Sequence, residues 1–115
     1  MCSQTTLQKV LNQTENRMKE LFGDSLKSVI LYGSYARGDY NGDSDIDIMV
    51  LVDIDRYELT RYRETIADFV HEMDREYNFE FMLSVLLQDA ETFNNYRNAS
   101  AFFRNVSMEG VAVNA

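Results

Sequence analysis

The chain has 115 residues, 45% of them hydrophobic, and a formal net charge of −8 at pH 7. This length suits one hydrophobic core, so we expect a single domain over residues 1–115. The acidic balance argues against direct nucleic-acid binding, which rests on Lys and Arg contacts to phosphate. The longest apolar run, Ile48–Val52, is far shorter than the roughly 20 residues of a membrane span. The single Cys2 and the polar N-terminus favour a reducing, cytoplasmic setting.

The N-terminal segment has helical periodicity. Apolar residues recur at helical spacing from Thr5 to Phe22, and Gly23 follows at a position typical of a helix C-terminus. Lys27–Tyr32 (KSVILY), which is apolar or aromatic from Val29 onward, then predicts a strand buried on both faces. Gly33 ends this strand.

The segment Asp45–Val52 predicts a second strand whose alternation separates its side chains into two faces. Asp45 and Asp47 share one face with Met49 and Leu51, because successive side chains on a strand point in opposite directions. The opposite face is wholly apolar. We therefore expect the two aspartates to point the same way.

A helix follows, with Asp53 or Asp55 as its expected N-cap. Its apolar stripe comprises Leu59, Tyr62, Ile66, Phe69, Val70, Met73 and Tyr77. Phe79–Leu87 predicts a third strand, and the helical connection before it suits a crossover between strands. On this strand Glu80 would share a face with Met82 and Ser84.

The tail predicts short helices over Ala90–Tyr96 and Ala101–Glu109, with Gly110 ending the second before a final Val-Ala-Val. In Phe102 and Phe103 the second helix has apolar side chains that suit the core or a partner surface. The order of elements indicates a small α/β or α+β fold, with a mixed sheet of three to four strands packed against helices.

The two aspartates are candidate metal ligands. Side chains at positions i and i+2 of a strand lie about 7 Å apart at the backbone, so both carboxylates can converge on a hard cation such as Mg²⁺. Glu80 is the candidate third carboxylate if its strand is a neighbour. Three acids around one or two metal ions would suit phosphoryl or nucleotidyl transfer.

The glycine turn supplies candidate phosphate contacts. Gly33 permits a close backbone approach, and Ser34 offers a hydroxyl and an N–H group at the start of a helical turn. Arg37, one turn later, is placed to contact the same phosphate. A nucleoside triphosphate bridging this turn and the metal ions is the expected ligand.

These residues together resemble a known signature. Gly33–Gly38 (GSYARG) followed by Ser44–Asp47 (SDID) is similar to the GS-x(10)-D-x-D pattern of the DNA polymerase beta-like nucleotidyltransferase superfamily. The short chain, and more loosely its tail around Phe102–Val111, resembles the minimal nucleotidyltransferase (MNT) group, whose members are often antitoxins of HEPN-domain ribonuclease toxins.

The resemblance implies ATP as donor and Mg²⁺, in two ions, as cofactor. It implies Asp45 and Asp47 as metal ligands, Gly33 and Ser34 at the triphosphate, and the third carboxylate, here Glu80, as ligand and base. Ser44 would either support the metal site through a hydrogen bond or start a turn.

The implied function is transfer of AMP from ATP to a tyrosine hydroxyl of a HEPN toxin, which would inactivate it. The alternatives are a non-catalytic antitoxin that neutralises the toxin by binding, and an antibiotic-type enzyme, which usually carries an extra helical domain absent here. The oligomeric state, with or without the toxin, stays open.

Two further expectations concern residues outside the signature. If Glu80 points outward, Glu76 and Asp74 are the next acids to consider for the third position. The only histidine, His71, lies off the apolar stripe of its helix, so we expect no functional role for it.

Overall fold

The computed structural model describes residues 3–42 and 44–113. Its elements in chain order are α1 (Gln4–Phe22), the 3₁₀ helix η1 (Gly23–Ser25), β1 (Leu26–Tyr32), α2 (Ser34–Arg37), β2 (Ile46–Val52), the 3₁₀ helix η2 (Arg56–Tyr62), α3 (Arg63–Glu76), β3 (Leu83–Asp89), α4 (Ala90–Tyr96), α5 (Ala101–Glu109) and β4 (Val111–Ala112).

The strands form one four-stranded mixed sheet in the order β3-β2-β1-β4. β1 pairs antiparallel with both β2 and β4, whereas β2 and β3 are parallel. Parallel neighbours need a crossover connection, which η2 and α3 provide here. The predicted mixed sheet packed against helices is confirmed, and β3 lies at one edge of it.

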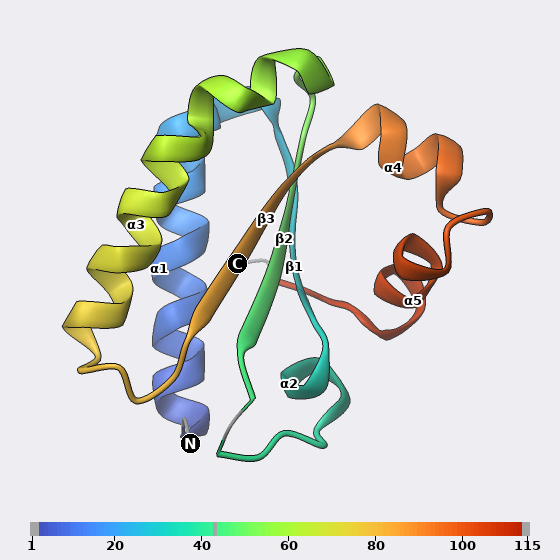
Figure 1. Ribbon diagram of the computed structural model, residues 1–115. Helices are drawn as coiled ribbons and strands as arrows, with labels where there is room; N and C mark the ends of the chain where they lie inside the picture. The colour runs from blue at the N-terminus through green and yellow to red at the C-terminus, as the bar shows by residue number, and fades with distance from the viewer. Residues whose placement is uncertain (1–2, 43, 114–115) are drawn as a thin grey trace.

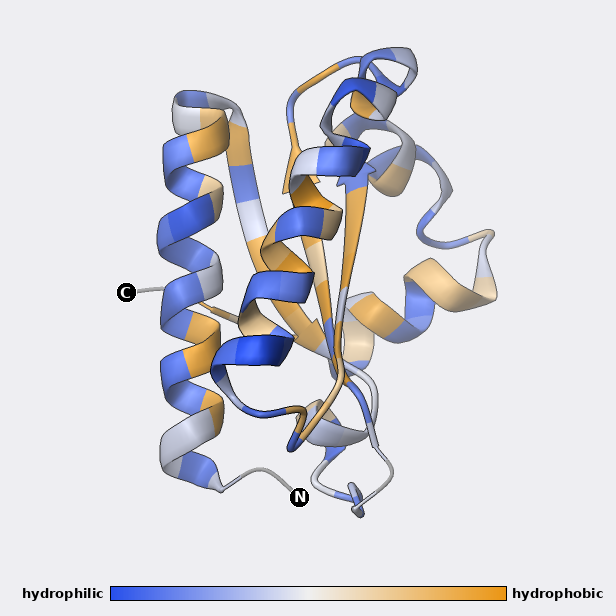
Figure 2. Ribbon diagram, turned by 60° about the vertical axis from the view of Figure 1, so that its left-hand side comes forward, coloured by the Kyte–Doolittle hydropathy of each residue, from blue (hydrophilic) through white to orange (hydrophobic). Residues whose placement is uncertain are grey.

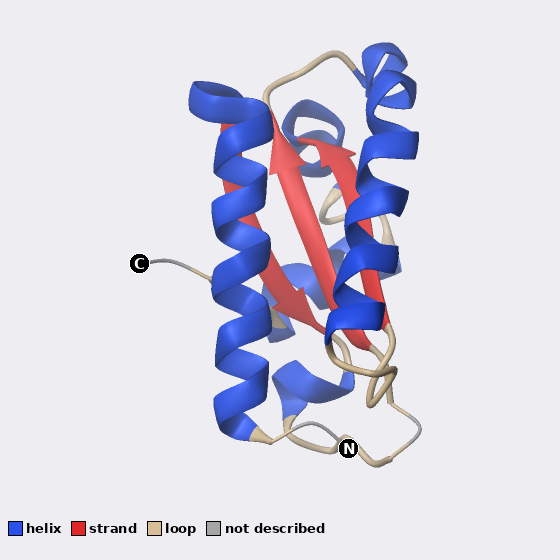
Figure 3. Ribbon diagram, turned by 90° about the vertical axis from the view of Figure 1, so that its left-hand side faces the viewer, coloured by secondary structure: helices blue, strands red, loops and turns tan. Residues whose placement is uncertain are grey.

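Helices cover both faces of the sheet. α1 and α3 lie side by side over one face, and α4 and α5 lie over the other (Figures 1 and 3). Apolar residues face inward from the strands and helices, while hydrophilic residues occupy the outer faces of α1 and α3 (Figure 2). The sheet is therefore the middle layer of three.

The alternation predicted for β2 is confirmed by two separate hydrophobic clusters. The larger cluster, under α1 and α3, includes the β2 side chains Ile46, Ile48, Val50 and Val52. The smaller cluster joins Met49 and Leu51 to Phe93 of α4 and Val106 of α5. Asp47 continues the face of the smaller cluster toward the start of β2, because side chains alternate along the strand.

Capping residues set the helix boundaries close to the predicted ones. The Ser3 side chain accepts a hydrogen bond from the Thr6 N–H at the start of α1, and Gly23 ends the helix with a φ of 52°. α4 and α5 have the predicted bounds. The predicted central helix is divided into η2 and α3, and Asp55 is the cap of η2, accepting from the Tyr57 N–H.

The third strand begins later than predicted. We expected Phe79–Leu87, but β3 is Leu83–Asp89. The chain after α3 turns first, because Asn78 and Phe79 both have positive φ values, 55° and 57°, which no strand residue adopts. The apolar and aromatic residues of this turn have a composition typical of a strand, which explains the wrong prediction. Glu80 lies in the turn before β3.

No helix within residues 3–42 and 44–113 is long and apolar enough to cross a membrane.

Candidate active site

Asp47 lies near the start of β2, in the middle of the sheet. It pairs with Tyr32 at the end of β1 on one side and with Ser84 of β3 on the other. Its side chain is half-buried, whereas Asp45, directly before β2, is exposed. The end of β1 and the start of β2 therefore meet at this carboxylate.

The turn between β1 and α2 packs directly against Asp47. Gly33 has a φ of 76°, and a Cβ built on it would lie 2.5 Å from Asp47 Oδ2. The Gly33 carbonyl accepts hydrogen bonds from the Ala36 and Arg37 N–H groups, both 3.1 Å, and so closes the turn that begins at Ser34. Only glycine allows this approach of backbone to carboxylate, which explains the residue type in the signature.

The carboxyl group of Asp47 is in an unfavourable environment for its charge. Burial raises the pKa of Asp47 most, the charge of Asp45 raises it further, and the charge of Arg37 lowers it. Burial and the Asp47 charge also raise the pKa of Tyr32. The negative charge at this position is therefore not balanced by the side chains around it.

Arg37 is held by other acids. Its Nε lies 3.1 Å from Asp39 Oδ2, and its Nη1 lies 3.3 Å from Glu109 Oε2 at the end of α5. The hydrogen bond to Asp39, followed by that to Glu109, raises the pKa of Arg37. Sequence reasoning missed Glu109, because nothing in the tail signals that α5 returns to the glycine turn.

The oxygen donors here fit a divalent cation. Asp45 and Asp47 interact electrostatically. Asp47, the partly buried one of the two, forms no ion pair with a basic side chain among the described residues. Mg²⁺ takes oxygen ligands and is commonly bound through one or two carboxylates together with substrate phosphates. A bound cation would remove the unfavourable charge that raises the pKa of Asp47.

Glu80 is not brought to this pair. It is exposed in the turn before β3, and the β3 residue opposite Asp47 is Ser84, four positions later. Within the described part of the chain no three His, Cys, Asp or Glu side chains form a group that could hold a metal ion. The candidate residues that the structure does bring together are the two aspartates, the glycine turn and Arg37.

The two substitute acids have structural positions. Asp74 is buried, and its Oδ1 accepts a hydrogen bond from the Leu83 N–H at the start of β3. Glu76 accepts from Gln13 Nε2 of α1, 3.1 Å away. Both hold the C-terminal end of α3 against its neighbours, so neither replaces Glu80 at the candidate site.

The loop after α2 is held by side chains at both ends. Ser44 Oγ accepts a hydrogen bond from the Asn41 N–H at 2.9 Å, which gives Ser44 the turn-forming role. Tyr40 stacks on Tyr35 with ring centroids 4.2 Å apart, and its hydroxyl accepts from Gln4 Nε2. The loop therefore returns the chain to β2 with Asp45 at its end.

A small pocket of about 220 Å³ lies beside the glycine turn. Tyr32, Gly33 and Arg37 line one side, and residues of α5 including Phe102 and Glu109 line the other. Phe102 is exposed and contacts the Tyr32 ring edge-on, 5.6 Å between centroids. The pocket joins the candidate phosphate contacts to the C-terminal helix, a connection that the sequence did not reveal.

Replacing Gly33 with Ala should destabilise the fold through Asp47. The positive φ alone costs about 1–3 kcal/mol for a non-glycine residue, and the Cβ also collides with Asp47 Oδ2. Gly38→Ala is the matched control, because Gly38 has a φ of 85° but open space around its Cβ position.

The measurement is urea unfolding of both variants, alone and combined with Asp47→Ala. We expect Gly33→Ala to lower the free energy of unfolding by about 1 kcal/mol more than Gly38→Ala, and the excess to shrink in the Asp47→Ala background. An equal cost of the two glycine variants would contradict the packing described.

Asp47→Asn should stabilise the protein at neutral pH. A carboxyl group whose folded-state pKa is raised binds more protons when folded, so its contribution falls as pH rises from the unfolded-state pKa, about 3.9, through the folded-state pKa. The amide removes this loss.

Urea unfolding at a series of pH values checks the expectation. The stability gain of Asp47→Asn should be largest at pH 7 and should shrink toward about pH 4. Asp68→Asn, at an exposed position of α3, should show no such trend. A variant less stable than the wild type at pH 7 would refute the electrostatic account.

The comparisons with known proteins identify the family of this chain. Residues 11–100 match the family model of the nucleotidyltransferase domain. Two relatives come from Methanocaldococcus jannaschii. "Putative protein adenylyltransferase MJ0604" is 33% identical over 90% of this chain and 93% of its own length. "Putative protein adenylyltransferase MJ0141" is 41% identical over 38% of this chain and 44% of its own length.

A solved structure shares the fold. The crystal structure of a mutant of the toxin-antitoxin MntA-HpeT superposes with a TM-score of 0.51 at 20% identity, covering 90% of this chain and 72% of that one. At this identity the likeness concerns the fold alone, and it agrees with the mixed sheet and its flanking helices. The family match covers most of the chain, including the glycine turn and both aspartates, and the chain therefore belongs to the nucleotidyltransferase family.

Proposed function

We propose that this nucleotidyltransferase transfers AMP from ATP to a tyrosine hydroxyl of a HEPN ribonuclease toxin, and that the transfer silences the toxin. The observation that carries the proposal is the unbalanced Asp47 carboxylate packed against the Gly33 turn. The names of the Methanocaldococcus relatives and the toxin-antitoxin likeness support the choice of a protein acceptor.

In this proposal Asp45 and Asp47 hold Mg²⁺, and Gly33 and Ser34 contact the triphosphate. A bound Mg²⁺ would supply positive charge to the phosphate oxygens. The tyrosine oxygen forms a bond to the α-phosphorus, the bond from that phosphorus to the bridging oxygen breaks, and pyrophosphate leaves. The hydroxyl proton passes to a base, the role predicted for Glu80.

Arg37 can exchange its present partners for phosphate. Asp39 and Glu109, which bind it, are both exposed, and exposed ion pairs contribute only about 0–1 kcal/mol. A triphosphate carries several charges and accepts two guanidinium hydrogen bonds at once. We propose that Arg37 leaves one or both carboxylates when ATP binds.

A protein acceptor suits the shape of the site. The pocket of about 220 Å³ beside the turn is smaller than the roughly 300–1,000 Å³ of typical small-molecule sites. The chain therefore offers little enclosure for a second small substrate beside ATP, such as an antibiotic. A tyrosine presented by a partner would bring its own surroundings and complete the site.

The proposal predicts label transfer from α-³²P-ATP and Mg²⁺ to a HEPN toxin encoded beside this protein. Asp47→Ala should lower the transfer rate by about 100-fold or more, the scale seen when a group that stabilises transition-state charge is lost. Asp68→Ala is the control and should leave the rate unchanged. Absence of label with the wild type, or equal rates for wild type and Asp47→Ala, would refute the proposed activity.

The same assay tests the role of Glu80. If the turn before β3 brings this carboxylate to the site when ATP and the toxin bind, Glu80→Gln should reduce label transfer as strongly as Asp47→Ala. An unchanged rate would show that the chemistry needs only the two aspartates from this chain.

A second candidate function is neutralisation by binding alone. The observation that favours it is the hydroxyl of Ser84, rather than a carboxylate, opposite Asp47 on the neighbouring strand. Growth of cells that express the toxin separates the two functions. Rescue by the Asp45→Ala/Asp47→Ala double variant would support binding, and failure of a folded double variant to rescue would support catalysis.

A further inference from the structure

The outer edge of β3 is unpaired within the described part of the chain. β3 is the first strand in the order β3-β2-β1-β4. The Ile46 N–H of β2 donates to the Met82 carbonyl, so the backbone groups of alternate residues, Val85 and Leu87, point to the free edge. At the start of this edge the Leu83 N–H donates to Asp74 Oδ1. Among the described residues, no side chain accepts a hydrogen bond from the N–H groups of Val85 and Leu87 in this way.

This edge lacks the usual protection against strand pairing. Natural edge strands commonly carry Lys, Pro or a bulge that blocks another chain. The segment from Leu83 to Leu87 reads Leu-Ser-Val-Leu-Leu and contains none of the blocking residues. Phe79, Met82 and Leu86 are exposed on or directly before the same strand. The edge is therefore suited to pairing with a further strand.

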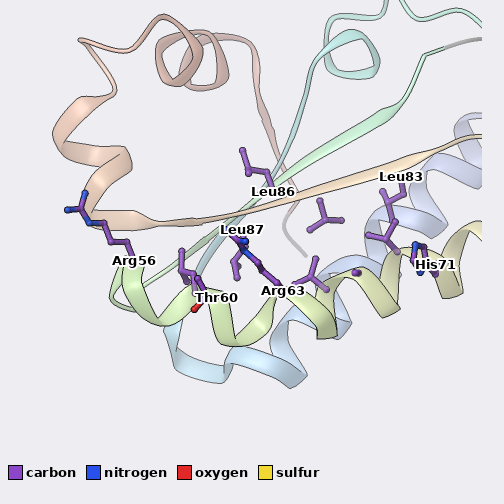
Figure 4. A pocket seen from close by; sticks show the side chains of 12 residues that line it. Arg56, Thr60, Arg63, His71, Leu83, Leu86 and Leu87 are labelled. Atoms are coloured by element: carbon purple, nitrogen blue, oxygen red, sulfur yellow. The ribbon is translucent and has the colours of Figure 1, made fainter.

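A groove of about 530 Å³ runs beside this edge, between β3 and the η2–α3 connection. Its apolar wall includes Ile66 and Val70 of α3, together with Val85 and Leu87 of β3. In Figure 4, Thr60 and Arg63 of the helical connection lie beside Leu87 of β3, with His71 near one end of the groove and Arg56 near the other. The groove can take alternate side chains of an extended peptide.

The charged groups that line the groove are all basic. Arg56 and Arg63 lie toward the end of β3 and His71 lies toward its start, and no acid lines the groove in a chain of net charge −8. The described residues place no carboxylate within ion-pair distance of either arginine. Arg56 instead donates to the Tyr57 hydroxyl. The charge of Asp89, at the end of β3, acts on Arg56, but Asp89 does not line the groove. The lining itself therefore carries net positive charge.

We propose that this groove and the free edge of β3 bind an extended acidic segment of another protein, which adds a fifth strand to the sheet. Backbone hydrogen bonds to Val85 and Leu87 would supply affinity. Every second side chain of the segment would enter the groove, with apolar ones against its wall and acidic ones against Arg56 and Arg63. This binding is separate from the Asp47 site and does not depend on the proposed transfer of AMP.

A second copy of this chain is a poorer occupant. The only acid of its β3, Asp89, already accepts a hydrogen bond from the Thr92 N–H as the cap of α4. Its groove would also bring a second pair of arginines to the contact. Like charges disfavour such pairing. The charge of the groove therefore points to an acidic partner.

The probe is a fluorescein-labelled peptide of about nine residues, a length that matches strand β3 and its flanks. Every second residue, which faces the groove, is Glu near both ends and Val between them, and the other positions carry Thr, because successive side chains of a strand point to opposite faces. Fluorescence anisotropy at about 50 mM salt, where charge interactions are weakly screened, gives its Kd. The control peptides carry Lys in place of Glu, or N-methyl groups on alternate backbone amides. The Glu peptide should bind at least about tenfold more tightly than either control.

Two double variants locate the contact. Arg56→Glu/Arg63→Glu should raise the Kd of the Glu peptide by about tenfold or more. Arg61→Glu/Arg75→Glu makes the same change in net charge at exposed positions outside the groove and should change the Kd by less than about twofold. Asp47→Ala should bind like the wild type, which separates this result from the proposed catalysis.

Three outcomes would overturn the proposal. Equal affinity for the Glu and Lys peptides would exclude an acidic occupant, and equal affinity for the N-methylated peptide would exclude strand addition. A dimer in sedimentation equilibrium that Val85→Lys dissociates would assign the edge to a second copy. Slowed hydrogen exchange at the Val85 and Leu87 amides when the Glu peptide is added would support the proposal.

Discussion

One unfavourable charge determines how the site is built. The Asp47 carboxylate is half-buried, interacts with a second aspartate, and packs against a glycine whose replacement by a larger residue would bring a Cβ into contact with it. A fold selected for stability alone would place an apolar or uncharged residue here, because burying an unpaired charge is costly. The arrangement is explained if the charge has a binding partner that is not part of the chain.

Two strands of the sheet and the helix α5 hold this charge in place. β1 delivers the Gly33 turn, β2 carries Asp47 between two hydrophobic clusters, and α5 returns Glu109 to the arginine of the turn. Because β2 is buried on both faces, the position of Asp47 is fixed by core packing. The exposed ion pairs of Arg37 are weaker constraints, so the contacts of its guanidinium are the easiest ones here to exchange for a ligand.

The sequence predicted the fold well, and it brought the glycine turn and the aspartate strand together correctly, because local patterns determine both. Alternation along β2 and the glycine turn are properties of a few adjacent residues, and both helices of the tail have side-chain caps, Asp89 and Ser100, that set their bounds. The roles of Glu109 and of the groove beside β3 depend on contacts between distant segments, which no local pattern reports.

The error at β3 has a local cause. Phe-Glu-Phe reads as a strand by composition, but the left-handed residues Asn78 and Phe79 turn the chain before it. This shift left Glu80 in the turn and placed Ser84 opposite Asp47. His71, for which we expected no functional role because it lies off the apolar stripe of its helix, lines the groove beside β3. Positive φ values at non-glycine residues are rare, so sequence rules place them poorly.

The most direct test of the central claim is a titration of the protein with Mn²⁺ in place of Mg²⁺, in the presence of a non-hydrolysable ATP analogue, followed by electron paramagnetic resonance. The account predicts saturable binding of the cation by the wild type, with at least about tenfold weaker binding by Asp45→Asn/Asp47→Asn, because both carboxylate ligands are removed. Equal binding by the two proteins would contradict it.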